Sequence, residues 1–151
     1  MAEDAMLLDR QAIMARVPHQ GMSCLLDGVC QWDQQHIICE SRSHLLSSNP
    51  YRVNGKLPAV CAVEFAAQSF ALHVSLKADD ATCSRGHGYL ASVRNLELLV
   101  DSLDECSGSL RIESKELAFQ QSGILYSFSI LHQDFQIARG QATIAFIRDV
   151  R

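Results

Sequence analysis

The order of apolar and polar residues singles out one segment of this chain. Residues 57–76, LPAVCAVEFAAQSFALHVSL, are apolar almost throughout and contain one formally charged side chain, Glu64. Pro58 suits the first turn of a helix, where its fixed φ is favourable and its missing N–H is not needed. The segment predicts a long helix, from Pro58 to about Leu76, that is buried on nearly every side.

The rest of the pattern predicts a short N-terminal helix and six strands. The helix is expected at residues 4–15, where Met6, Leu7, Ile13 and Met14 form an apolar face. Strands are expected at 24–33 and 36–46 before the long helix, and at 88–100, 108–119, 123–132 and 135–147 after it. The sequences QSG and HQDF predict tight turns between the last three strands, and Asn-Pro and Asn-Gly mark the loop before the long helix as turns.

Two strands before the long helix and four strands after it predict an α+β fold rather than a parallel α/β sheet, in which helices and strands would alternate. A helix that is apolar nearly all round must be covered on every side, and a curved antiparallel sheet wrapped around it is the economical solution. We therefore expect a hot-dog fold in one domain spanning residues 1–151. Open sheet edges and the apolar helix further predict at least a dimer.

Composition and charge limit the binding partners and the cellular compartment that we expect for this chain. The net charge is −4 and lysine and arginine are scattered singly, which argues against a nucleic-acid or anionic membrane surface. The six cysteines form no C-x-x-C pair, and the N-terminus does not resemble a secretory signal, so we expect unpaired thiols in the cytoplasm. A membrane span over residues 57–76 would place Glu64 in the bilayer at a cost of roughly 2.5–3.5 kcal/mol, so a buried helix of a soluble protein is favoured.

The predicted helix places Glu64 and Gln68 on one face, because residues four apart are neighbours on a helix. A buried carboxylate has a raised pKa unless it is hydrogen-bonded or paired, and such a group suits acid–base chemistry at neutral pH. Amide groups around Ala59 and Val60, at the helix start, could polarise a thioester carbonyl. From the helix alone, a structural acid satisfied by an arginine or a backbone amide is the simpler interpretation.

Three segments together resemble the 3-hydroxyacyl-ACP dehydratases of hot-dog fold. They are VPHQGMSCLLDGV, LPAVCAVEFAAQSFALHVSL and GYLASVRNLELL. The spacing in PAVCAVEFAAQ is most similar to the dehydratase-like proteins of aryl polyene clusters.

The resemblance implies specific roles for residues of the helix and the strand that follows it. Glu64 matches the catalytic carboxylate, and Gln68 the helix glutamine. Pro58 matches the proline at the helix start, and Ala59 replaces a glycine whose N–H helps bind the thioester carbonyl. Val60 and Tyr89 are expected to contact the substrate.

One departure from the family concerns the catalytic histidine. Family members carry it in the loop before the helix, but here that loop reads NPYRVNGKLP and has none. We rank His19 first and His87 second as replacements, with His44 a further possibility, although a structural role is the simpler interpretation of each. Three explanations stay open: another histidine has taken over, the chemistry has changed, or the chain binds acyl groups without reacting them.

The resemblance thus implies a 3-hydroxyacyl thioester dehydratase of fatty-acid or polyene-type biosynthesis. No metal or redox cofactor is implied, because phosphopantetheine arrives with the substrate on acyl carrier protein or coenzyme A. The chain is expected to form a homodimer, or a heterodimer with another hot-dog protein. Two alternatives are a catalytically weak acyl-binding partner of another dehydratase and a hot-dog acyl thioesterase.

Overall fold

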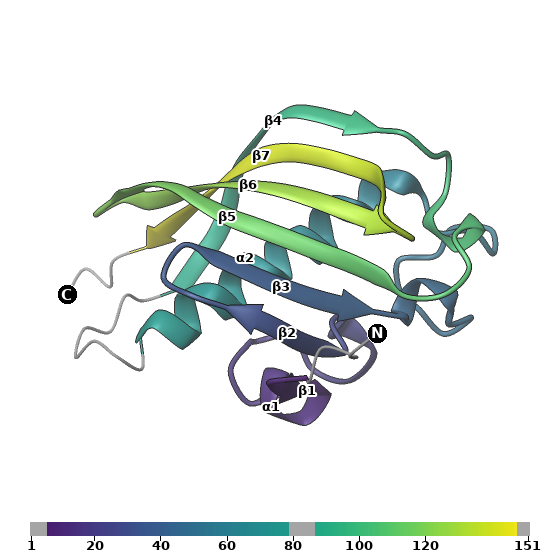
Figure 1. The fold of residues 1–151 in the computed structure, drawn as a ribbon, viewed down its shortest axis with the longest axis horizontal. Helices are drawn as coiled ribbons and strands as arrows, with labels where there is room; N and C mark the ends of the chain where they lie inside the picture. Colours follow the sequence, from purple (N-terminus) through teal and green to yellow (C-terminus); the bar gives the residue numbers. More distant parts are fainter. Residues whose placement is uncertain (1–5, 79–86, 148–151) are drawn as a thin grey trace.

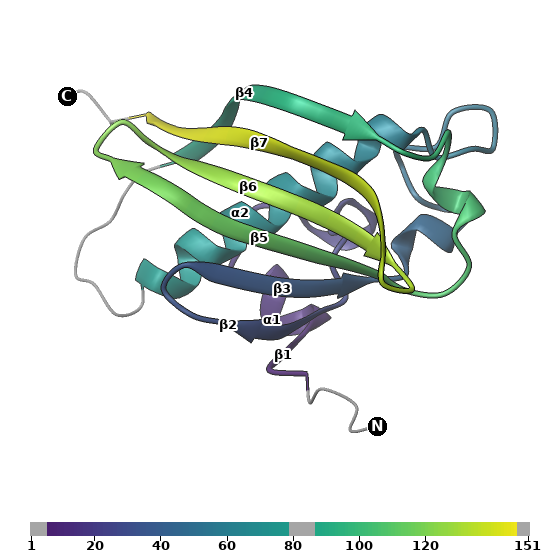
Figure 2. The ribbon, with the colours of Figure 1, turned by 45° about the horizontal axis from the view of Figure 1, so that its top comes forward.

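Seven strands form one antiparallel sheet, and the helix α2 (Ala62–Ala78) runs along one face of it (Figures 1 and 2). A computed structural model describes residues 6–78 and 87–147. The strands are β1 (Leu8–Asp9), β2 (Gly28–Trp32), β3 (His36–Ser41), β4 (His87–Leu98), β5 (Leu110–Gln120), β6 (Gly123–His132) and β7 (Phe135–Ile147). The remaining elements are α1 (Arg10–Met14) and four short 3-10 helices, η1 (Gly21–Ser23), η2 (Ser43–Leu45), η3 (Ala59–Cys61) and η4 (Leu103–Glu105).

The strand order is β1-β2-β3-β5-β6-β7-β4, so the strand that follows α2 lies at one edge of the sheet. Strand β4 pairs with β7 alone among the described strands, and its outer edge has no partner there. The curved sheet with α2 on its inner face is the hot-dog fold (Figure 2). The predicted α+β class and hot-dog architecture are therefore confirmed.

Helix α2 supplies the centre of the core. Its buried aromatic residues Phe65 and Phe70 face the sheet, and Phe70 stacks on Tyr126 of β6 with ring centroids 4.5 Å apart. Full burial of a side chain of this kind contributes about 1.5–3 kcal/mol. The stretch Ala59–Ala78 is long and apolar enough to cross a membrane, but more than half of it is buried inside the fold, as expected for a core helix.

Two predicted turns are confirmed by backbone geometry. Asn54 and Gly55 both have positive φ, and the flanking Val53 and Lys56 exchange two backbone hydrogen bonds. Gln133 and Asp134 have positive φ in the turn between β6 and β7. Such pairs of left-handed residues form hairpin turns whose twist matches the flanking strands.

Three predicted boundaries are wrong for local reasons. The helix expected at 4–15 begins only after Asp9, whose side chain caps it by accepting from Ala12 N, while Leu8 pairs with Val29 as β1. Residues 1–5 of that prediction lie outside the described part. The strands expected at 24–33 and 36–46 are shorter and span Gly28–Trp32 and His36–Ser41. At their ends side-chain hydrogen bonds take the place of backbone pairing, because the hydroxyls of Ser41 and Ser43 both donate to Leu25 O. The long helix agrees with its predicted bounds, and its first turn is the 3-10 helix η3 before α2.

Candidate active site

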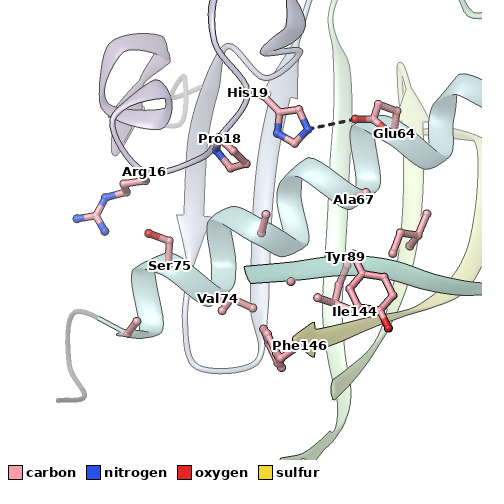
Figure 3. Close-up of a pocket in the computed structure, with 14 residues that line it drawn as sticks. Arg16, Pro18, His19, Glu64, Ala67, Val74, Ser75, Tyr89, Ile144 and Phe146 are labelled. Carbon is pink, nitrogen blue, oxygen red and sulfur yellow. Dashed lines mark ion pairs between the residues drawn. The ribbon is translucent and has the colours of Figure 1, made fainter. Parts of the chain in front are cut away.

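Glu64 and His19 meet at one end of a pocket on the face of α2 (Figure 3). The His19 Nε2 atom lies 3.4 Å from the Glu64 Oε1 atom, and each side chain is about one-third exposed. Glu64 comes from the first turn of α2, and His19 comes from the loop between α1 and η1. The structure thus brings together the two residues predicted as catalytic.

The loop that carries His19 is held by its neighbours. The Gln20 side chain donates to Val17 O at 3.0 Å and also to Met14 O, and Arg10 donates to Gly21 O at 2.6 Å. Pro18 restricts the backbone immediately before His19. The imidazole is therefore presented to Glu64 by a loop that is tied to α1 on both sides.

Gln68 of α2 forms side-chain hydrogen bonds to the chain just after the His19 loop. Its side-chain oxygen accepts from Leu25 N at 2.8 Å, and its nitrogen donates to Ser23 O at 2.8 Å and to Glu64 at 3.4 Å. Gln68 is 1% exposed and does not line the pocket. Its first role is structural: it fastens the chain around residues 23–25 to the helix and directs one N–H toward Glu64.

The pocket has a volume of about 410 Å³ and runs along α2 from Glu64 toward Ser75 (Figure 3). Its floor is the small-residue side of the helix, with Ala67 and Ala71. Its walls come from β4 and β7, and Arg16 and Ser75 lie toward the far end. The wall residues are Gly88, Tyr89, Leu90, Ile144 and Phe146. The cavity is therefore lined mainly by small and apolar side chains, between Glu64 and His19 at one end and Arg16 and Ser75 at the other.

Tyr89 lies where a substrate-contacting residue was predicted, on the pocket wall, and it is half exposed. The residues at the helix start do not line this pocket. Pro58 forms an isolated bridge with Ser102, and the Ala59 N–H donates to Asp101 O at 3.1 Å. The predicted role of the Ala59 amide in binding a carbonyl stays a prediction, and in this fold its hydrogen already has an acceptor. Val60 is exposed at 55%, on the surface beside this turn.

Two other histidines, His44 and His73, are bonded away from Glu64. His44 is fully buried, its Nε2 atom lies 2.9 Å from Cys106 O, and burial lowers its pKa. His73 is also buried, on the opposite side of α2 as predicted, between the Tyr126 hydroxyl and Asp33 O. The side chain of His87 lies outside the part of the chain that the structure describes.

Sequence reasoning did not single out Tyr51, in the loop before α2. Burial, followed by the charge of Glu64, raises the pKa of Tyr51. No periodicity marks a loop residue of this kind. Cys61, one turn before Glu64, has its thiol pKa raised by burial and by the same carboxylate, which does not favour it as a nucleophile.

Comparison with known proteins agrees with this geometry. The model of a family described as ApeP dehydratase matches residues 11–150. A structure of the dehydratase heterocomplex ApeI:P from Xenorhabdus doucetiae superposes with a TM-score of 0.80 at 17% identity, covering 91% of each chain. No protein of curated function matches the sequence significantly.

Hot-dog thioesterases are similar in fold at a greater distance. A thioesterase from Haemophilus influenzae has a TM-score of 0.58 at 11% identity, covering 82% of this chain and 80% of that one. A thioesterase mutant from Staphylococcus aureus has a TM-score of 0.55 at 10% identity, covering 80% of this chain and 92% of that one. These likenesses show the shared fold. The family match spans nearly the whole described fold and includes Glu64, His19 and the pocket, and the chain accordingly belongs to the ApeP-like dehydratase family.

Proposed function

We propose that the chain dehydrates 3-hydroxyacyl thioesters, carried on acyl carrier protein or coenzyme A, in fatty-acid-like or polyene-type biosynthesis. The observation that carries this proposal is the Glu64–His19 pair at the end of an apolar pocket. Dehydration needs one group that removes the proton at C2 and one that protonates the departing hydroxyl at C3. The C3–O bond breaks, the C2–H electron pair becomes the double bond, and the products are an enoyl thioester and water.

Glu64 is assigned the proton transfer to or from the C3 hydroxyl. It opens into the pocket, it is flanked by neutral donors, and it sits beside the space where an acyl chain would lie. Positioned acid–base groups contribute about 10²–10⁴-fold to a rate. Phosphopantetheine would enter with the substrate, and the chemistry itself calls for no redox partner.

His19 is proposed to orient Glu64 rather than to act as the base. Its Nε2 atom lies 3.4 Å from Glu64 Oε1, and the loop that carries it is tied to α1. The loop before α2 lacks the histidine that the resemblance implies as the base. We infer that the second acid–base group is supplied from outside this chain.

A second hot-dog subunit is the proposed source of that group. Strand β4 offers an unpaired edge within the described sheet, and it carries exposed apolar side chains: Tyr89, Leu90, Val93 and Leu98. An exposed apolar edge strand pairs readily with another chain. The ApeI:P relative is itself a heterocomplex. We propose that this chain forms a heterodimer through β4, in the cytoplasm, where cysteines that form no disulfide within the described residues would stay reduced.

The deciding experiment is a mass-spectrometric assay of 3-hydroxyacyl-ACP, with the chain alone and co-expressed with each hot-dog protein of its own genome. Loss of water that requires a partner and stops with Glu64→Gln supports the proposal. Loss of water that persists in the complex with Glu64→Gln assigns the chemistry to the partner and makes this chain its acyl-binding subunit. Release of free acid instead of an enoyl product identifies a thioesterase, as the similar folds allow.

A further inference from the structure

The pocket on α2 carries a charged side chain at each end. Glu64 lies at the end described above, and Arg16 lines the opposite end together with Ser75 (Figure 3). Glu64 and Ser75 are eleven residues apart on one helix, which corresponds to about 16 Å along its axis at roughly 1.5 Å per residue. An acyl chain that starts at Glu64 and follows the helix therefore reaches a cationic group.

The backbone of Arg16 is fixed where α1 ends. Its N–H donates to Ile13 O at 2.9 Å, and the next N–H, that of Val17, donates to the same carbonyl at 3.2 Å. Val17 is 6% exposed and belongs to the hydrophobic core. The loop that presents His19 to Glu64 therefore also holds Arg16 at the far end of the pocket.

Among the described residues that line the pocket, the side chains between its two ends supply no hydrogen-bonding group apart from Tyr89. Those from α2 and β7 are Ala67, Ala71, Val74, Ile144 and Phe146. Such walls suit the methylene groups of an acyl chain. They do not suit the pantetheine arm of a carrier, whose two amide groups lose free energy when they are buried without partners. The geometry therefore favours the acyl tail as the group that lies between Glu64 and Arg16.

A guanidinium at the end of such a pocket discriminates between chemical groups at the end of the acyl chain. Arginine presents five N–H donors in a planar fork that matches a carboxylate, so it can bind one while keeping bonds elsewhere. Hydrogen bonds between charged partners are roughly twice as strong as those between neutral groups. A methyl end would displace water from the guanidinium without forming a hydrogen bond in return, which costs free energy.

We propose that Arg16, assisted by the Ser75 hydroxyl, is a specificity-determining residue that binds a carboxylate at the distal end of the acyl chain. The preferred substrates are then 3-hydroxyacyl thioesters whose acyl group derives from a dicarboxylic acid. The inference rests on the proposed function, because it takes the acyl group to lie along α2 with C3 at Glu64. Arg16 contacts the substrate far from the reacting atoms and exchanges no proton with it.

Ligand binding tests this subsite without any turnover. The probes are saturated acyl N-acetylcysteamine thioesters, which cannot lose water, in pairs of equal length that end in a methyl group or in a carboxylate. Isothermal titration calorimetry uses the full chain, together with its hot-dog partner where one binds. At the best-fitting length, the Kd of the carboxylate probe should be at least about tenfold lower than that of the methyl probe. Equal or weaker binding of the carboxylate probe at every length would overturn the proposal.

Substitutions assign the preference to Arg16. Arg16→Gln should raise the Kd of the carboxylate probe at least about tenfold, because charge-assisted hydrogen bonds are lost. The Kd of the methyl probe should stay unchanged, which also shows that the variant is folded. Arg16→Lys should keep part of the preference, since the charge remains but the planar fork is lost. The control Arg42→Gln removes an exposed arginine outside the pocket and should bind both probes as the wild type does.

A third ligand, phosphopantetheine, distinguishes the two ends of the substrate, because it carries a phosphate and no acyl chain. Its affinity should be the same for the wild type and Arg16→Gln. An affinity that falls in Arg16→Gln, with no carboxylate preference among the thioesters, would assign Arg16 to the carrier arm and refute the proposal. Dehydration without a carboxylate preference would refute the subsite alone. Selective binding without dehydration in any complex would support the subsite and refute the proposed function.

Discussion

The Nε2 atom of His19, in the loop after α1, lies 3.4 Å from Oε1 of Glu64, in the first turn of α2. This contact allows a hydrogen bond between the two side chains. In the proposed mechanism Glu64 is the acid or base, and His19 orients it.

Substitution should separate these two roles. We expect Glu64→Gln to lower kcat of the active complex about 10²–10⁴-fold, because the proton-transferring group is removed. His19→Ala should lower it only about tenfold, as expected for one lost hydrogen bond in a partly exposed site. Mass-spectrometric rates at saturating substrate measure both. Equal losses in the two variants would show that His19 exchanges protons with the substrate.

Gln68 should matter for stability before it matters for rate. Gln68→Ala leaves the Leu25 N–H and the Ser23 carbonyl without their partners, and we expect the free energy of unfolding to fall by about 2 kcal/mol. Urea unfolding followed by circular dichroism measures this loss. Ser75→Ala, on the half-buried side of α2, is the matched control and should change the free energy by less than about 0.5 kcal/mol. A Gln68→Ala variant as stable as the wild type would show that these bonds do not contribute to the free energy of unfolding.

The floor of the pocket should set the length of acyl chain accepted. Ala71→Phe adds an aromatic ring to the pocket lining between Glu64 and Ser75 on α2, so it should lower kcat/KM for long 3-hydroxyacyl thioesters and spare 3-hydroxybutyryl thioester. Ala71 faces the pocket at intermediate exposure, so the ring can enter the cavity without displacing the core. Rates across a series of chain lengths measure the effect. A uniform loss of kcat/KM at all lengths would mean that the acyl chain lies elsewhere.

Stability should decrease in mild acid because two buried histidines resist protonation. Burial lowers the pKa values of His44 and His73, so below the ordinary histidine pKa of about 6.5 the unfolded chain binds protons that the folded chain does not. The free energy of unfolding should therefore be highest above pH 6.5 and fall as the pH drops below it. Urea midpoints between pH 5 and 8 measure this slope.

Variants at a buried and an exposed histidine test which groups cause this pH dependence of the free energy of unfolding. His73→Gln should flatten it, while His36→Gln, at an exposed position, should keep the wild-type slope. The His73→Gln protein is expected to be less stable at every pH, because the bonds to Tyr126 and Asp33 are altered. An identical slope in all three proteins would assign the acid sensitivity to other groups.

The outer edge of β4 should carry the subunit interface. Val93→Lys places a charge among the exposed apolar residues of this edge strand and should weaken association at least tenfold, since lysine on an edge strand opposes pairing. Leu117→Lys, at an exposed position of the interior strand β5, is the control and should assemble normally. Light scattering after size-exclusion chromatography measures both. A wild-type chain that stays monomeric with every hot-dog partner would refute the interface.

The sequence by itself determined the class of fold and the principal acid. An apolar helix with a single carboxylate, followed by strand patterns joined by short turns, leaves few ways to bury the helix, and the hot-dog fold is confirmed. Glu64 was predictable because a charge in an apolar helix is conspicuous. The start of the first helix was not predictable from periodicity, which gives a longer helix. The Asp9 side chain caps the helix and ends the extended segment before it.

Only the tertiary structure decided which residues surround that acid. His19 lies in a loop, where no periodic pattern operates, and local bonds of Gln20 fix the backbone of that loop. The loop lies beside Glu64 only because the folded chain brings it to α2. A long-range bond likewise occupies the Ala59 amide, since its acceptor, Asp101, arrives only when the chain returns after β4.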